Sequence, residues 1–221
     1  PAAAEEIRIL RDIFLAEKTG VHIHIQHVST KRGLEMIREA KKKGLRISCE
    51  VTPHHFTLTD EAVLKWGTYA KMSPPLRTKE DVEAMKQGLA DGTIDAIATD
   101  HAPHTIEDKK RSLPEAANGI IGLETALGLA LTELYHTGVM PLEALIEKFT
   151  FAPAKILNIP KGTLKPGADA DITVIDLEKQ WTVDAEAFHS KGRNTPFNGR
   201  QLKGKAVMTI VNGEIRYSER S

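Results

Sequence analysis

The hydrophobic pattern of the first 150 residues alternates between helical spacing and strand-like runs. Ile7, Leu10 and Phe14 recur at helical spacing within residues 2–18, and Gly20 follows as a stop signal. The β-branched run 21–28 then predicts a strand. The alternation continues with helices expected between Thr30 and Gly44 and over 60–66, 78–89, 120–137 and 141–149, and with strands over 45–51 and 93–99. This spacing is typical of βα units that form a parallel sheet.

The pattern changes after residue 160, where short β-rich runs are separated by Pro-Gly and Asn-Gly turns. We therefore expect one unit over residues 1–158 and a β-rich unit over 159–221. Two loops also interrupt the first unit: residues 71–77, with paired prolines, and the polar segment 100–118. A loop as long as the second is often functional.

Composition narrows the possible partners and location. The 221 residues are 41% hydrophobic and 27% charged, and 30 basic residues balance 30 acidic ones. This balance gives no sign of a nucleic-acid or membrane partner. No apolar run is long enough to cross a bilayer. A single cysteine, Cys49, fits a reducing compartment, so we expect a cytoplasmic protein.

Polar side chains cluster after three of the expected strands. His27 follows the first, His54 and His55 follow the second, and Asp100, His101 and His104 follow the third. Loops at the carboxyl ends of parallel strands face one cavity, and imidazole and carboxylate are the usual ligands of catalytic zinc. The combination favours metal-assisted hydrolysis, although any one histidine, taken alone, is more often a hydrogen-bonding residue at a strand end.

Other chemistries fit the sequence less well. His22 and His24 have the His-x-His spacing of a metal site, but they lie within a strand, which favours a packing or hydrogen-bonding role. The sequence has no G-x-S-x-G elbow, no P-loop and no G-x-G-x-x-G. Cys49 lies in an apolar strand and has no evident histidine partner.

The segment "ATDHAPH" (98–104), followed after four residues by Lys109, resembles the signature of the dihydroorotases. The segments "HVST" (27–30), "EVTPHH" (50–55), "KMSPPLR" (71–77), "GLET" (122–125), "KGRNTPF" (191–197) and "GKAVMTIVNGEI" (204–215) extend the resemblance over the chain. The segment 162–176 resembles amidohydrolases more broadly.

The resemblance implies an α/β fold, namely the C-terminal part of a (β/α)₈ metal-dependent hydrolase barrel plus part of a small β-sandwich. It implies one or two zinc ions and the reversible cyclisation of N-carbamoyl-L-aspartate to (S)-dihydroorotate in pyrimidine biosynthesis. In such enzymes zinc lowers the pKa of a water molecule and polarises the carbonyl, while an aspartate moves the proton.

The resemblance also assigns roles to individual residues. Asp100 matches the catalytic aspartate that also binds zinc, and His27 matches a histidine ligand of zinc. Candidate substrate-binding residues are Ser73, His104, Asn118 and Gly119. Serine stands at 73 where many bacterial relatives have asparagine, and a hydroxyl cannot reproduce the geometry of a carboxamide. Asn118-Gly119 stands where Phe-Gly is more common.

The family's first metal motif, His-x-His followed by arginine, has no counterpart here, and neither do its later lysine or carboxylate and histidine ligands. We therefore expect this chain to be the C-terminal portion of a longer enzyme whose N-terminal part is its essential partner. A homodimer or association with aspartate transcarbamoylase is also open. The alternatives are another cyclic amidohydrolase, such as a hydantoinase or allantoinase, and a non-catalytic dihydroorotase-like subunit that scaffolds aspartate transcarbamoylase.

Overall fold

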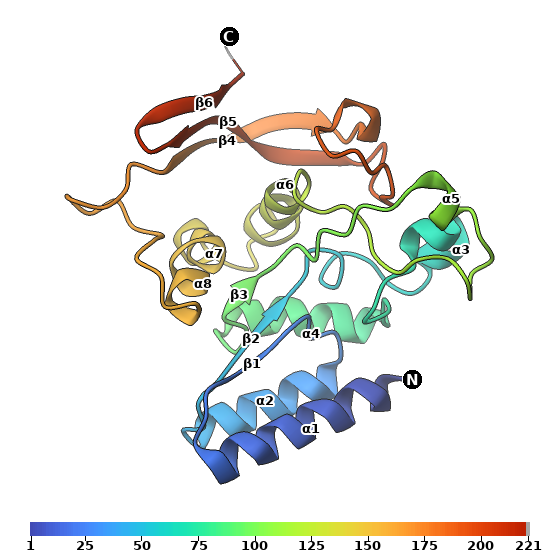
Figure 1. The fold of residues 1–221 in the computed structure, drawn as a ribbon, viewed down its shortest axis with the longest axis vertical. Coiled ribbons are helices and arrows are strands. Elements are labelled where there is room, and N and C mark those ends of the chain that lie inside the picture. Colours follow the sequence, from blue (N-terminus) through green and yellow to red (C-terminus); the bar gives the residue numbers. More distant parts are fainter. Residues whose placement is uncertain (220–221) are drawn as a thin grey trace.

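The computed structural model describes residues 1–219, in which two three-stranded sheets are joined by helices (Figure 1). The first sheet and its helices comprise α1 (Ala2–Thr19), β1 (Ile23–Ile25), α2 (Lys31–Lys42), β2 (Ile47–Val51), α3 (Ala62–Trp66), η1 (Gly67–Ala70), α4 (Lys79–Ala90) and β3 (Ala96–Ile97). There follow α5 (Ile106–Lys109), α6 (Ala126–Ala130), η2 (Leu131–Tyr135), α7 (Leu142–Phe149) and α8 (Phe151–Ile156). The second sheet contains β4 (Ile172–Thr182), β5 (Gln201–Val211) and β6 (Glu214–Ser218), with η3 (Ala185–Ala187) between β4 and β5.

The first sheet is parallel and has the strand order β1-β2-β3. Strand β2 is buried along its whole length, and its alternation divides the sheet into two unlike faces. Ile47, Cys49 and Val51 belong to the main hydrophobic core. Ser48 and Glu50 lie on the opposite face, where they contact histidines near β1. One face of this sheet is therefore apolar and the other polar.

Helices α1, α2 and α4 lie on the apolar side of this sheet (Figure 1). Helix α2 begins after Thr30, whose side chain accepts a hydrogen bond from the backbone of Gly33. Helix α4 begins with a capping box between Thr78 and Asp81, as its sequence predicts. The connection that follows β1 therefore ends at Thr30, and the connection that precedes α4 ends at Thr78.

The second sheet is antiparallel, with the strand order β4-β5-β6, and it lies over helix α6 (Figure 1). Close approach of the helix to the sheet depends on Gly128, because a Cβ there would lie 2.9 Å from the Trp181 ring. The connection between β4 and β5 returns to the first unit, where Asn194 hydrogen-bonds to the carbonyl oxygens of Ala102 and Gly119.

Several elements differ from the expected ones. The strand expected over 93–99 is reduced to β3, and the helix expected over 120–137 begins only at Ala126 and passes into a π-helical turn. The residues before Ala126 make contacts other than those of a helix. Ile120 pairs with His101 in an isolated β-bridge, and the backbone of Gly122 donates a hydrogen bond to the His101 ring. Helix α5 lies inside the expected loop 100–118, and α8 follows α7 without having been predicted. No helix among residues 1–219 is both long and apolar enough to cross a membrane.

Candidate functional site

His27 and Asp100 come together at the carboxyl ends of β1 and β3. His27 Nε2 lies 3.6 Å from Asp100 Oδ1, and both side chains are partly open to solvent. Both residues have a left-handed backbone, with φ of 54° at His27 and 47° at Asp100. This conformation is uncommon for residues other than glycine and is found at functional sites more often than elsewhere.

Glu50 lies behind His27, inside strand β2. Its Oε1 is 2.9 Å from His27 Nδ1, a close contact that is not aligned as a hydrogen bond, and its Oε2 is 3.1 Å from His24 Nε2. Burial raises the pKa of Glu50, but His24 and His27 together outweigh burial and lower this pKa to about 2. The same carboxylate raises the pKa of His27 against the effect of burial. Glu50 is therefore an ionised neighbour that orients the His27 ring.

The polar contacts continue along the sheet, away from Asp100. The Ser48 hydroxyl lies 2.8 Å from His24 Nδ1 and 2.9 Å from His22 Nε2. His22 and His24 thus take part in hydrogen bonding with Ser48 and Glu50, the role that their position in the sequence favours. A connected row of polar side chains runs along this face and ends at His27.

The spacing of His27 and Asp100 is compatible with side chains that bind metal. A separation of 3.6 Å is too long for a hydrogen bond. It is close to the roughly 3.4 Å between two tetrahedral ligands that each lie about 2.0–2.2 Å from zinc. Among residues 1–219, however, no cluster of three or more histidine, cysteine or acidic side chains is available to hold a metal ion. A catalytic zinc ion needs about three protein ligands, so further ligands would have to come from other residues.

The other histidines near these strand ends have structural contacts. His55 is buried; its Nδ1 lies 2.7 Å from the Thr52 hydroxyl and its Nε2 is 3.0 Å from the Pro74 carbonyl oxygen. Burial lowers the pKa of His55 to about 4 and that of His54 well below its ordinary value, so both rings are neutral. His101 Nδ1 accepts from the backbone of Gly122. His55 and His101 thus brace the loops around the site, whereas the buried His54 ring lies against that of His55 and its Nε2 has no hydrogen-bond partner within residues 1–219.

The candidate substrate-binding residues lie on two neighbouring loops. His104 Nε2 is 2.8 Å from the Asn118 carbonyl oxygen, so this nitrogen carries the proton. Gly119 has φ of 113° and is packed against Ala102, and its N–H donates to the Lys71 carbonyl oxygen. Of the pair 118–119, Asn118 is the exposed member.

Ser73, the remaining candidate, is exposed, and a cis peptide bond joins it to Pro74. It lies between two anchored residues, because Lys71 accepts from Gly119 and Pro74 accepts from His55. The structure thus holds the 71–77 loop beside residues 118–119.

Sequence reasoning missed two residues that organise the site. The first is Glu50, which the sequence does signal, because a charged residue interrupts the apolar run of β2. Asn194 lies some 90 residues from the loops that it joins, and its Oδ1 accepts from the backbone of His104 at 3.1 Å. No local pattern could have shown that contact.

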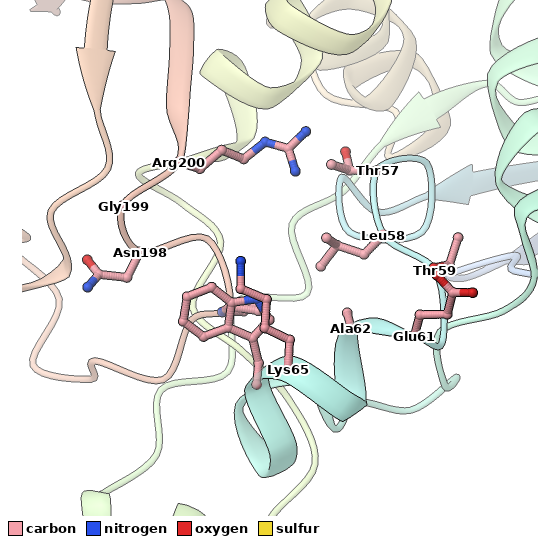
Figure 2. A pocket seen from close by; sticks show the side chains of 11 residues that line it. Thr57, Leu58, Thr59, Glu61, Ala62, Lys65, Asn198, Gly199 and Arg200 are labelled. Carbon is pink, nitrogen blue, oxygen red and sulfur yellow. The ribbon is translucent and has the colours of Figure 1, made fainter.

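A cavity of about 520 Å³ lies apart from His27 and Asp100 (Figure 2). It is bounded by residues 57–66 on one side and 196–200 on the other, and Arg200 extends toward it. The Arg200 guanidinium is already paired with Glu133. The cavity contains none of the residues that the sequence assigns to catalysis.

Comparisons with known proteins agree on the family. The model of the "Amidohydrolase family" matches residues 2–216. A curated dihydroorotase from Syntrophus aciditrophicus (strain SB) is 56% identical over 219 residues, which are 99% of this chain and 51% of that protein. A dihydroorotase from Pelotomaculum thermopropionicum is 58% identical over 221 residues, which are 100% of this chain and 52% of that protein.

Solved structures show the same fold. The L-hydantoinase (dihydropyrimidinase) from Arthrobacter aurescens has a TM-score of 0.95 at 34% identity, over 99% of this chain and 50% of its own. The dihydropyrimidinase from Brevibacillus agri NCHU1002 has a TM-score of 0.95 at 26% identity, over 100% of this chain and 50% of its own. The chain spans about half the length of the curated relatives that it matches.

Proposed function

Because the chain belongs to the amidohydrolase family, we propose that it carries the catalytic aspartate of a dihydroorotase. The whole enzyme would interconvert N-carbamoyl-L-aspartate and (S)-dihydroorotate by closing or opening a cyclic amide. Support comes from the relatives named dihydroorotase, which are 56% and 58% identical over nearly all of this chain. The observation that carries the proposal is the convergence of His27 and Asp100 at two strand ends.

The same proposal assigns the two sheets to parts of a larger fold. Strands β1, β2 and β3 would be consecutive strands of a (β/α)₈ barrel, with residues 1–158 as the barrel part. Residues 159–221 would be part of a small β-sandwich. The parallel order β1-β2-β3, the helices on one face and the polar opposite face support a barrel wall, since barrel interiors hold the side chains of one strand face.

Asp100 would move the proton of the reaction. Its carboxylate is partly exposed and lies at the end of a strand, where a substrate can reach it. In ring opening it would accept a proton from the attacking water and deliver that proton to the leaving amide nitrogen. Ring closure follows the same path in reverse.

His27 and Asp100 would contribute two ligands to one or two zinc ions. When bound, zinc would lower the pKa of the attacking water and polarise the carbonyl of the ring. The negative charge of Glu50, 2.9 Å from His27 Nδ1, would favour a proton on that nitrogen, which leaves Nε2 free as a ligand. The remaining ligands would belong to the half of the enzyme that the relatives have and this chain does not match, and that half would be its essential partner.

His104 and Asn118 would bind the carboxylate groups of the substrate. Because His104 Nε2–H donates to the Asn118 carbonyl oxygen, its Nδ1 is the atom that remains for a ligand. A carboxylate at this position would accept a hydrogen bond from Nδ1. Ser73 and the backbone at residues 118–119 would complete the contacts.

Two alternatives are less well supported. A hydantoinase shares the fold, but the hydantoinase and dihydropyrimidinase structures are 34% and 26% identical, well below the curated dihydroorotases. A non-catalytic subunit that scaffolds aspartate transcarbamoylase would have no use for a paired His27 and Asp100. A cytoplasmic location and a homodimer are compatible with the proposal.

The proposal is tested with a full-length enzyme that contains this chain. That enzyme, loaded with zinc, should interconvert carbamoyl aspartate and dihydroorotate, and Asp100→Asn should lower kcat by at least about a hundredfold while circular dichroism stays unchanged. Asp60→Asn, at an exposed position away from His27, is the matched control. Turnover of hydantoins in place of dihydroorotate, or full activity in Asp100→Asn, would overturn the assignment.

A further inference from the structure

Lys109 is a buried lysine whose ammonium group, among residues 1–219, hydrogen-bonds to carbonyl oxygens alone. The residue is 1% exposed. Its Nζ donates to the carbonyl oxygens of Ala117 at 2.8 Å and Gly119 at 3.0 Å, and lies 3.4 Å from that of Lys71. These oxygens belong to two loops, 71–77 and 100–119, that carry the candidate substrate-binding residues.

Lys71 holds the same segment from its other side. Its Nζ lies 2.5 Å from the Ala116 carbonyl oxygen and 3.1 Å from that of Pro114. The two lysines therefore bind four carbonyl oxygens within residues 112–119, which we call the 112–119 loop. At its end, Gly119 donates its N–H to the Lys71 carbonyl oxygen, which closes the contact between the two loops.

Within residues 1–219 neither ammonium group lies within ion-pairing distance of a carboxylate. Burial and, to a smaller extent, the nearby charge of Lys71 together lower the pKa of Lys109 to about 8. An unpaired buried charge is costly, and an apolar side chain would pack in its place without that cost. The position of Lys109 is thus explained by its donors and its charge better than by packing.

We propose that Lys109, assisted by Lys71, is a positioning residue that holds the 112–119 loop in the shape in which Asn118 and His104 meet an anionic substrate. The two lysines fix the carbonyl groups on either side of Asn118, which stays exposed, and the Asn118 carbonyl in turn holds the His104 ring. Their positive charge is not neutralised by the protein, so it also favours carboxylates bound beside the loop. This inference rests on the proposed function.

The charge and the donors of Lys109 are removed together in Lys109→Met, which keeps the length of the side chain. In the zinc-loaded full-length enzyme, Lys109→Met should raise KM for dihydroorotate roughly tenfold, because two or three carbonyl oxygens lose their donor, while kcat falls less than threefold. Lys110→Met, at the exposed neighbouring position, is the matched control and should leave both values unchanged. Lys71→Met should raise KM in the same direction, and Lys71→Arg should restore it.

A second measurement reports on the loop without substrate. Trypsin cleaves after Arg111, which is exposed at the start of the loop and is retained in every variant. Cleavage at this bond, followed by mass spectrometry, should be roughly tenfold faster in Lys109→Met and Lys71→Met than in Lys110→Met. If Lys109→Met does not fold, the same two measurements are made on Lys71→Met, since Lys71 is only half-buried. Lys71→Arg should then restore the wild-type KM and cleavage rate.

The outcomes separate this inference from the proposed function. A wild-type enzyme without dihydroorotase activity would refute the proposed function, and the cleavage rates would still decide whether the lysines hold the loop. An active wild-type enzyme whose lysine variants keep KM and the cleavage rate within twofold of the control would refute the positioning role. A loss confined to kcat would also refute it, since it would place the effect on the chemical step.

Discussion

Glu50→Gln should weaken zinc binding while leaving the fold intact. Glu50 is 9% exposed, and its carboxylate lies between two imidazoles, 2.9 Å from His27 Nδ1 and 3.1 Å from His24 Nε2. As a carboxylate it hydrogen-bonds to His24 and places its other negatively charged oxygen against His27 Nδ1. A glutamine of the same size has one oxygen and one NH₂ group, so it can accept from only one ring and must donate to the other.

The expected size of the effect follows from this exchange. Where the amide NH₂ faces His27, Nδ1 must lose its proton, and the proton then sits on Nε2, the atom that would bind the metal. Loss of such a supporting contact typically lowers metal affinity about 10–100-fold, which corresponds to about 1.4–2.7 kcal/mol. Zinc affinity should therefore fall within this range, and activity should recover when zinc is added to saturation.

The assay is competition for zinc between the full-length apo-enzyme and a chromophoric chelator. Glu39→Gln removes an equal charge from the exposed surface of α2 and serves as the matched control. A zinc affinity for Glu50→Gln within twofold of this control would refute the reasoning. So would a weaker affinity accompanied by loss of secondary structure, since the effect would then belong to folding.

Three further predictions concern stability and reactivity. Gly119→Ala should destabilise the enzyme by more than about 1 kcal/mol, because φ is 113° and the new Cβ would lie 2.5 Å from that of Ala102; an unchanged melting temperature would contradict this. Glu5→Gln should cost about 1.5–3 kcal/mol in urea unfolding, because the partly buried Arg77, 3.0 Å away, loses its charged partner. A double-mutant cycle with Arg77→Met that shows no coupling would exclude the pair. Burial raises the pKa of Cys49 to about 12, so iodoacetamide at pH 8 should label it at least about a hundredfold faster in urea than in the native enzyme, and equal rates would show that the thiol is accessible.

The sequence predicted the order of elements in the first unit and the strand ends at which the polar residues gather. The reason is physical: a parallel sheet places the carboxyl ends of neighbouring strands at one edge, so residues after β1 and β3 approach each other across β2. This edge and the family resemblance together point to His27 and Asp100. Their separation in the structure agrees with that choice, while their chemical roles stay predictions.

The extent of the elements was less predictable. The run 93–99 reads as a strand, but β3 is limited to Ala96 and Ile97. Ala98 still donates to the Val51 carbonyl oxygen, and the chain then turns into the left-handed conformation of Asp100. The helix expected from residue 120 is delayed because Ile120 pairs with His101. Both outcomes are set by contacts between distant segments, which local hydrophobic spacing does not record.

The contacts that organise the site were the least visible in sequence. Lys109 belongs to the motif that carries the resemblance, yet nothing in that motif indicates that its ammonium group lies against carbonyl oxygens of residues 117 and 119. Asn194 reaches the same carbonyl at Gly119 from the connection after β4. Backbone carbonyls have no sequence signature, so a side chain that binds them can be recognised only once the loops are placed.

The alternation of strand β2 separates the residues that fold this sheet from those that adjust its chemistry. Cys49 and Val51 enter the hydrophobic core on one face, whereas Ser48 and Glu50 contact the histidine row on the other. A charged residue is tolerated inside this strand because its two imidazole neighbours compensate for its burial. Substitutions one position apart in β2 should therefore fall into different classes: those at Cys49 change stability, and those at Glu50 change how firmly His27 is held beside Asp100.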